Sequence, residues 1–274
     1  MNASINEHEG GNDPPHVAPV GHLIHPALSG FPLTTLADGR VVGEFHQSRL
    51  ASVFQPIVPA NGGDAIGHHG YLRVASAGGN ALAPYHLFAQ AVDDAALVKL
   101  DRLTRSLHAI NYFHQAAPHG KLFLNVEQRL LTTVANEHGL VFESILGELG
   151  VKPERVVISL PNEALSNPAL LVRSILSYRN RGYGVMIHVN SITDPGLGRL
   201  FLAEPHYVQA DMPPAESAAL AGKMLHSLKR AGFRVVARKV ETGQQAELAR
   251  EIGFDLIHGF HIGLPRTTLA REAA

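Results

Sequence analysis

Several strand-like runs in this chain carry side chains that can bind ligands or do chemistry. The stretch "GHHGYLRV", residues 67–74, holds two adjacent histidines and an arginine, "GVMIHV" contains His188, and "FRVVARKV" contains Arg238. Imidazole binds zinc and other late transition metals, whereas an arginine offers a bidentate fork to phosphate oxygens. Ser159 with His188 could act as a nucleophile and its base, although nothing in the sequence places an oxyanion hole or an orienting acid around them. Metal binding, anion binding and acyl transfer are therefore the chemistries to weigh.

The common enzyme motifs are missing from the sequence. We find no Gly-x-Ser-x-Gly elbow, no P-loop and no Rossmann glycine pattern, since "GLGRLF" after Pro195 lacks both the preceding strand and the third glycine. The sequence therefore does not favour these classes of hydrolase, nucleotidase or dehydrogenase.

Short β-branched runs alternate with segments of helical period from about Ser48 onward, and these elements must position the side chains above. Helices are predicted over residues 91–115, 168–181, 216–231 and 242–252. Strands alternating with helices favour a barrel of the triosephosphate-isomerase kind, with an open doubly wound sheet as the alternative. In both folds a site forms at the C-terminal strand ends. The predicted strands are eight: "SVFQPIV", "GYLRVA", "KLFLNV", "RVVISL", "GVMIHV", "YVQAD", "FRVVARKV" and "DLIHGF".

Composition limits the partners. The chain has 274 residues, 45% hydrophobic and 17% charged, which favours one large domain. A formal net charge of −1 gives no bulk attraction to nucleic acid or to an anionic membrane, so we expect neither as a partner. The absence of cysteine excludes disulfides and fits a reducing cytoplasm. Since we find no signal-peptide pattern and no apolar run of about 18 residues, we predict a soluble, cytoplasmic protein.

The first 45 residues differ from the rest. They are rich in Gly, Pro, Asn and His with only scattered apolar side chains, a composition that buries too little surface to offset the entropy of ordering. We predict a flexible, largely disordered tail over residues 1–45 and a folded domain over 46–274. The irregular spacing of the tail histidines indicates solvated residues rather than metal ligands; they are His8, His16, His22 and His25.

The strand ends carry a resemblance to a known family. Along the chain, the segments are "FQPIV", "GYLRV", "LAPYHLFAQA", "LFLNV", "VVISLPNEAL", "RGYGVMIHV", "VVARKVET" and "GFHIGLP". From Val53 to Pro265 this order resembles the EAL-domain family, the phosphodiesterases of the bacterial second messenger cyclic di-GMP. The resemblance implies a TIM-barrel-like (β/α)8 EAL fold with one antiparallel strand, and a nucleotide cleft at the strand C-termini.

The catalytic positions of that family are mostly altered in this chain. Family members hold two divalent ions through carboxylates and one asparagine, and such paired ions need several oxygen ligands. The resemblance therefore implies a degenerate domain, and we predict that metal-dependent hydrolysis is absent. The signature Glu-Ala-Leu falls on His69, Gly70 and Tyr71. Of the other positions, Asn125, Asp211 and Glu241 are kept, while Ser159, His188, Val189, Gln209, Arg238 and Lys239 replace family residues.

A different metal site is one alternative. The resemblance places His69 and His188 at positions that face the family's ions, and with Asp211 they could form a three-ligand site. The chain holds 17 scattered histidines, so we favour polar residues that line a cleft without metal. We expect no cofactor.

The substitutions also remove negative charge and add positive charge at one end of the barrel. A cleft of that kind could hold phosphate directly, which makes a metal-free cyclic di-GMP receptor an alternative function. The candidate nucleotide-binding residues are Gln55, Pro56, Leu72, Arg73, Asp101, Asp211, Arg238, Glu241 and Pro265.

The interpretation we favour from sequence is an inactive regulatory protein in cyclic di-GMP-type signalling that binds an unknown protein partner. The turn "SYRNRGYG", residues 177–184, offers residue types common at interfaces, namely Tyr178, Arg179, Arg181 and Tyr183. Arginines at a helix C-terminus also simply complement the helix dipole. A dimer is a further option, because family members pair through helices beside the fifth and sixth strands. The segment "VNSITDPGLG" departs from the family loop that links that interface to the site.

Overall fold

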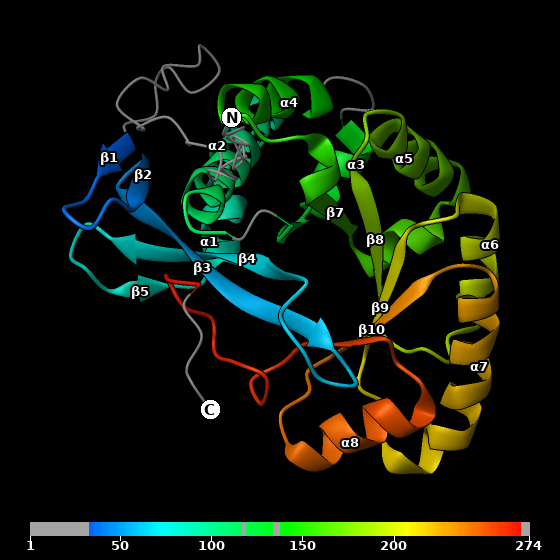
Figure 1. The fold of residues 1–274 in the computed structure, drawn as a ribbon. Coiled ribbons are helices and arrows are strands. Elements are labelled where there is room, and N and C mark those ends of the chain that lie inside the picture. Colours follow the sequence, from blue (N-terminus) through cyan, green and yellow to red (C-terminus); the bar gives the residue numbers. More distant parts are fainter. Residues whose placement is uncertain (1–32, 117–118, 134–137, 270–274) are drawn as a thin grey trace, which may run out of the picture.

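The computed structural model describes residues 33–116, 119–133 and 138–269, and a closed barrel lies at its centre (Figure 1). Eight strands close it in the order β3-β11-β10-β9-β8-β7-β6-β4, with β4 pairing back onto β3. The expected strands and the barrel are thus confirmed, and the open sheet is not formed. The strands are β3 Ser48–Pro59, β4 Gly67–Ser76, β6 Lys121–Asn125, β7 Val156–Leu160, β8 Gly184–Val189, β9 Tyr207–Asp211, β10 Arg234–Arg238 and β11 Leu256–Ile257.

One strand of the barrel runs against the others, as expected. β3 is antiparallel to both β4 and β11, whereas the remaining barrel pairs are parallel. A short connection between β3 and β4 allows the reversal, because Gly62 and Gly63 adopt φ of 85° and 119° there. A parallel pair would instead need a crossover of a dozen or more residues.

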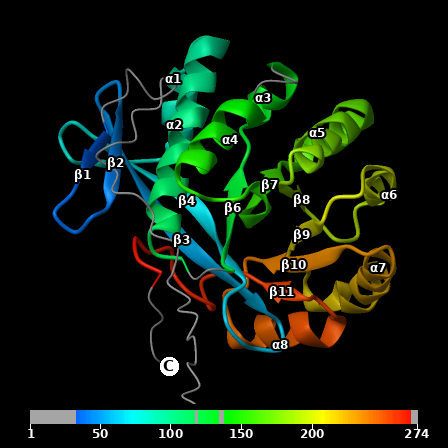
Figure 2. The same cartoon turned by 45° about the horizontal axis from the view of Figure 1, so that its top comes forward.

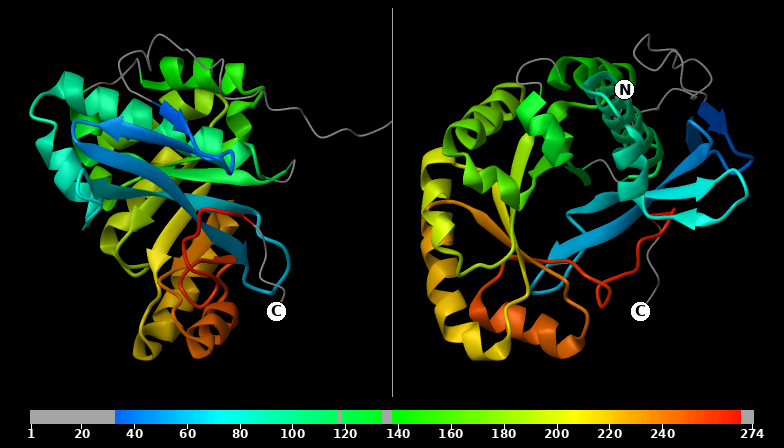
Figure 3. Two further views of the ribbon diagram at one scale, coloured as in Figure 1. Left: turned by 90° about the vertical axis from the view of Figure 1, so that its left-hand side faces the viewer. Right: turned by 180° about the vertical axis from the view of Figure 1, so that it is seen from behind.

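Helices cover the outside of the barrel (Figures 2 and 3). The expected 242–252 helix has a capping box from Thr242 and Gln245 and ends at Gly253, whose φ is 100°. The expected 91–115 helix begins later, because Asp93 caps it by accepting from the Ala96 N–H at 2.7 Å. The α-helices are α1 Pro84–Gln90, α2 Asp94–Phe113, α3 Gln128–Thr133, α4 His138–Glu148, α5 Pro168–Asn180, α6 Leu200–Ala203, α7 Ala218–Arg230 and α8 Gly243–Ile252. Short 3-10 turns lie at Pro153–Arg155, Asn162–Ser166, Pro195–Arg199 and Ala215–Ser217. Within the described ranges, no helix combines the length and the apolar character that crossing a membrane requires.

Residues 33–45 correct the expected tail. They form β1 Leu33–Thr35 and β2 Val41–Phe45, which extend the sheet beyond β3, while β5 Ala81–Leu82 extends it beyond β4. Val41 and Phe45 are buried. The composition of the first 45 residues conceals these two short strands, because Gly, Pro, Asn and His are frequent over most of that segment. Residues 1–32 lie outside the described part of the chain, so the prediction for them is untested.

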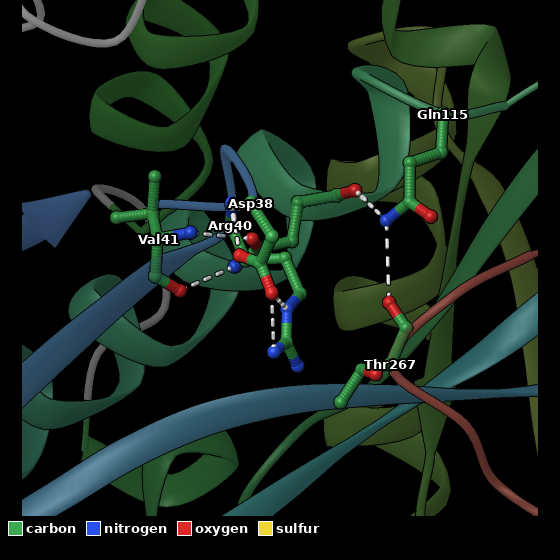
Figure 4. Close-up of polar contacts among 6 residues, drawn as sticks. Asp38, Arg40, Val41, Gln115 and Thr267 are labelled. Atoms are coloured by element: carbon green, nitrogen blue, oxygen red, sulfur yellow. Dashed lines mark hydrogen bonds and ion pairs between the residues drawn. The ribbon is translucent and has the colours of Figure 1, made fainter. Parts of the chain in front are cut away.

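Helix α2 and the turn that follows it hold this extension and the C-terminal segment, respectively (Figure 4). The Asn111 side chain accepts from the Val41 N–H and donates to the Val41 carbonyl, both at 2.8 Å. One turn later, Gln115 donates to the Thr267 carbonyl at 3.3 Å and accepts from the Leu269 N–H at 3.2 Å. One amide on α2 and one in the turn after it therefore satisfy backbone groups from opposite ends of the described chain.

Candidate functional site

Inward-facing side chains form two successive layers in the barrel. The deeper one, here called the apolar layer, consists of Ile57, Phe123, Val157, Met186, Tyr207, Val236 and Leu256. Side chains two positions apart on a strand share a face. The residues two positions further toward the C-terminal ends of the parallel strands, and two positions earlier on the antiparallel β3, are therefore inward as well, and all of them are polar. This polar layer consists of Gln55, His69, Asn125, Ser159, His188, Gln209, Arg238 and His258.

The sequence prediction anticipated most of the polar layer. Seven of its members were candidates above, and the structure brings them together at one end of the barrel. His258 was missed, although the run "DLIHGF" that contains it was assigned to the last strand. The signal was available, since His258 follows the inward Leu256 by two positions.

His258, His69 and Asn125 of the polar layer are linked, through Tyr71, by hydrogen bonds and ring stacking. His258 Nδ1 lies 3.0 Å from the Pro56 carbonyl oxygen, which can only accept, so Nδ1 carries the proton. His258 Nε2 therefore accepts from the Tyr71 hydroxyl at 2.9 Å. Tyr71 in turn stacks on His69, with ring centroids 4.8 Å apart and planes inclined by 14°. His69 Nε2 lies 2.9 Å from Asn125 Oδ1 and donates to it.

Burial keeps these rings neutral. Desolvation lowers the pKa of His69 to about 3, helped by the nearby His258, and lowers the pKa of His258 to about 4. Desolvation likewise raises the pKa of Tyr71 to about 12. At neutral pH this part of the site therefore offers hydrogen bonds but no charge.

Another part of the site is ionic, and its members His188, Asp211, Arg238 and Lys239 are here called the ionic cluster. Asp211 Oδ1 pairs with Arg238 Nε, and its Oδ2 accepts from Lys239 Nζ at 2.7 Å. His188 Nε2 lies 3.6 Å from Asp211 Oδ1, beyond hydrogen-bonding distance. Partial burial works against ionisation of Asp211, yet the hydrogen bond from Lys239 and the charge of Arg238 hold its pKa below the ordinary value. Desolvation and Arg238 together lower the pKa of His188, so that ring is neutral.

Buried polar atoms in this layer lack partners. His69 Nδ1, His188 Nε2 and Gln209 Nε2 are inaccessible and make no hydrogen bond within the described structure. An unsatisfied buried group costs about 1–3 kcal/mol. Three side chains of the polar layer therefore carry buried atoms without a partner, and a ligand site can leave such atoms unsatisfied.

A cleft of about 460 Å³ opens above the polar layer. It joins six of the candidate nucleotide-binding residues: Gln55, Leu72, Arg73, Arg238, Glu241 and Pro265. Tyr71, Lys239, His258 and Phe260 also line it and were not candidates. Gln55 is fixed there, because its Nε2 donates to the Gly263 carbonyl at 2.9 Å.

The three remaining candidates lie elsewhere. Pro56 contributes its carbonyl to His258, and Asp211 lies behind Arg238 and Lys239. Asp101 is buried on α2 at 4% exposure, where Arg105 Nε pairs with its carboxylate at 2.9 Å. The structure therefore does not bring Asp101 to the cleft.

The three histidine and aspartate candidates for a metal site are not arranged around a common point. Among the described residues, no three His, Asp or Glu side chains are grouped so that they could share an ion. His69 hydrogen bonds to Asn125, whereas His188 and Asp211 belong to the ionic cluster. Val189, another altered family position, is fully buried in the packing around the barrel.

The turn at residues 177–184, whose residue types are common at interfaces, makes contacts within the chain. Tyr183 is 1% exposed and its ring stacks on Phe142. Arg179 donates to the Glu204 carbonyl at 2.7 Å, and Arg181 pairs with Glu143 at 3.4 Å. These contacts hold the turn after α5 against neighbouring elements. Tertiary packing therefore uses residue types that are also common at protein interfaces.

Comparison with known proteins supports this fold. A family model described as the EAL domain matches residues 39–265. The FimX EAL domain from Pseudomonas aeruginosa bound to c-di-GMP is 17% identical, with 82% of this chain and 94% of that chain covered and a TM-score of 0.68. The YkuI protein of Bacillus subtilis, with an EAL domain, in complex with substrate c-di-GMP and calcium, is 18% identical at a TM-score of 0.68. That match covers 81% of this chain and 57% of that chain.

A standalone EAL protein from Vibrio cholerae O395 in its c-di-GMP-bound form gives the same TM-score of 0.68 at 15% identity, with 81% and 94% of the two chains covered. No curated protein matches the sequence. At these identities the solved structures establish the fold.

Proposed function

We propose, from the premise that this chain belongs to the EAL-domain family, that it binds cyclic di-GMP without hydrolysing it and acts in signalling through binding. One observation carries the proposal. The cleft is lined by Arg73, Arg238 and Lys239, with Glu241 as the one carboxylate among its lining residues. Such a lining favours a phosphodiester anion directly.

The residues present do not fit the pair of divalent ions that hydrolysis in this family requires. The Asn125 side-chain oxygen accepts from His69, and both oxygens of Asp211 face cationic side chains. Hard ions need several oxygen ligands with negative charge, and here an arginine and a lysine pair with the carboxylate of Asp211. We therefore derive no hydrolytic step for this site.

Two kinds of contact contribute to ligand binding in this cleft, ionic contacts to phosphate and stacking contacts to a base. The three cations supply charge-assisted hydrogen bonds to phosphate oxygens. Tyr71 and Phe260 supply flat apolar surface, and Phe260 is 59% exposed at the rim, where it suits stacking against a base. Solved structures of similar fold carry c-di-GMP in their printed descriptions, which supports the choice of this nucleotide.

The test is calorimetric titration with cyclic di-GMP, in EDTA and again in Mg²⁺. We expect the same affinity in both buffers, and about tenfold weaker binding for Arg73→Ala, the loss of one charge-assisted contact. Arg250→Ala serves as the control, because Arg250 pairs with Glu247 on α8 and does not line the cleft. Binding that requires Mg²⁺, or release of a linear dinucleotide, contradicts the proposal. No heat in either buffer removes the nucleotide from the account.

Regulation without chemistry requires a protein partner, and the cleft rim offers apolar surface for one. Phe260, which lines the cleft, is 59% exposed, and an exposed apolar group next to a ligand site allows the ligand to change partner affinity. We expect nucleotide-dependent capture of the partner in pull-downs, weakened by Phe260→Ser. Leu220→Ser on α7 is the matched control, since Leu220 is 55% exposed and does not line the cleft. Equal loss in both variants contradicts the rim as the contact.

A further inference from the structure

Lys239 has a backbone conformation that its side chain does not favour. Its φ is 59°, and His46 and Glu204 are the other non-glycine residues with positive φ in the described chain. The left-handed region is unfavourable for a residue with a Cβ. Adjacent residues of an extended strand point to opposite faces, so this turn lets Arg238 and Lys239 reach the same carboxylate.

Asp211 holds the two cations in different ways. Its Oδ1 pairs with Arg238 Nε, which leaves the terminal guanidinium nitrogens of Arg238 for a ligand. Its Oδ2 instead takes the ammonium of Lys239, which is the whole charge of that side chain. The Lys239 side chain is 57% exposed and that of Arg238 is 31% exposed. Lys239 is therefore the more solvent-exposed of the two cations and has the greater freedom to move.

Resting on the proposed function, we propose that Lys239 is a reserve phosphate ligand, which exchanges Asp211 Oδ2 for a phosphate oxygen when cyclic di-GMP enters the cleft. Arg238 stays on Asp211 Oδ1 during the exchange and binds the phosphate through its outer nitrogens. Asp211 thus orients one cation and restrains the other. The affinity of the cleft depends on the balance between its own carboxylate and the incoming anion.

Asp211→Asn separates these two roles. An asparagine keeps an Oδ1 acceptor for Arg238 Nε, while its Nδ2 group donates and cannot hold an ammonium. We expect cyclic di-GMP to bind Asp211→Asn about two- to fivefold more tightly than wild type, the size of one exposed ion pair. The gain should vanish in the double variant Asp211→Asn, Lys239→Gln, because no ammonium is left to release.

Two controls make the measurement specific. Glu204→Gln also removes one negative charge from a surface ion pair, with Arg179, and should leave the affinity unchanged. Asp211→Ala should bind more weakly than Asp211→Asn, because Arg238 loses its orienting acceptor. Thermal unfolding of each variant without ligand checks that the fold persists.

The outcomes distinguish this inference from the proposed function. Wild-type binding with equal or weaker binding by Asp211→Asn overturns the exchange and leaves the receptor intact. An unchanged gain in the double variant likewise overturns it, since Lys239 is then not the released group. Absence of cyclic di-GMP binding in every variant overturns both.

Discussion

The apolar and polar layers lie two residues apart on the same strands, yet they differ in how well their atoms are satisfied. The apolar layer is closely packed, with Phe123 fully buried and its ring edge-on to Tyr207 at a centroid distance of 5.5 Å. The polar layer, by contrast, leaves buried atoms of His69, His188 and Gln209 without partners. Two positions along the same strands therefore separate a closely packed layer from a layer with unsatisfied polar atoms.

That division has a chemical reason. The deeper layer is closed to ligands and can be optimised for packing alone. A layer that exchanges hydrogen bonds with a ligand must leave donors and acceptors uncommitted, at a cost in stability that the apolar layer offsets. The following variants test this division, from the largest expected effect to the smallest.

Truncation in the apolar layer should cost most. Phe123→Ala removes a fully buried ring and should lower the free energy of unfolding by about 3–5 kcal/mol. Ser159 belongs to the polar layer on the neighbouring strand β7. Ser159→Ala should lower the free energy of unfolding by less than about 1 kcal/mol. Urea denaturation of both proteins gives the comparison. Equal losses would break it, because the polar layer would then share the structural role of the core.

Lowering the pH should reduce the stability of the fold through the buried histidines of the polar layer. The folded-state pKa values of His69 and His258, about 3 and about 4, lie below the ordinary value of 6.5. As pH falls below 6.5 the unfolded chain takes up protons that the folded protein does not, so stability present above pH 6.5 is lost toward pH 4. Each histidine should contribute about 1.4 kcal/mol per pH unit to that slope.

Denaturant midpoints measured between pH 7 and pH 4.5 test this. His258→Gln keeps an acceptor for Tyr71 and a donor for Pro56, and should reduce the slope by about one proton. If the slope of stability against pH stayed the same in His258→Gln, burial would not lower the pKa of His258 in the folded protein.

The smallest effect has the opposite sign. Gln209→Met replaces a side chain whose buried Nε2 lacks a partner, and should stabilise the fold by about 1 kcal/mol. Gln55→Met is the matched control, because Gln55 Nε2 donates to the Gly263 carbonyl and its loss should destabilise by a similar amount. Thermal unfolding measures both. Destabilisation in both variants would show that Gln209 is satisfied in solution.

Most of the architecture could be predicted from sequence, because each barrel strand is a short β-branched run between turn residues. The two-residue period then places the polar layer, and only His258 was missed. Strands β1 and β2 were missed because their few apolar residues acquire meaning only against α2, which lies about 60 residues further along the chain.

Pairwise contacts could not be predicted in the same way. Nothing local in the sequence places Lys239 on Asp211, since the contact depends on a left-handed residue after β10. Asp101 and Tyr183 carry residue types of a site and of an interface, yet packing from distant helices buries both. Residue type and strand position were therefore sufficient to predict which side chains form the two layers. They were insufficient to predict which residues those side chains contact.

The antiparallel strand β3 has a consequence for folding kinetics. It joins β4, its neighbour in sequence, to β11 near the end of the chain, and the hydrogen bond from Gln55 to Gly263 spans 208 positions. Such distant pairings close late and slowly, because the intervening chain must be ordered first. A nucleotide in the cleft would touch strands from both ends of the chain at once. Bound nucleotide would thus connect these strands in the folded barrel. It would slow unfolding as well as shift the folding equilibrium toward the folded state.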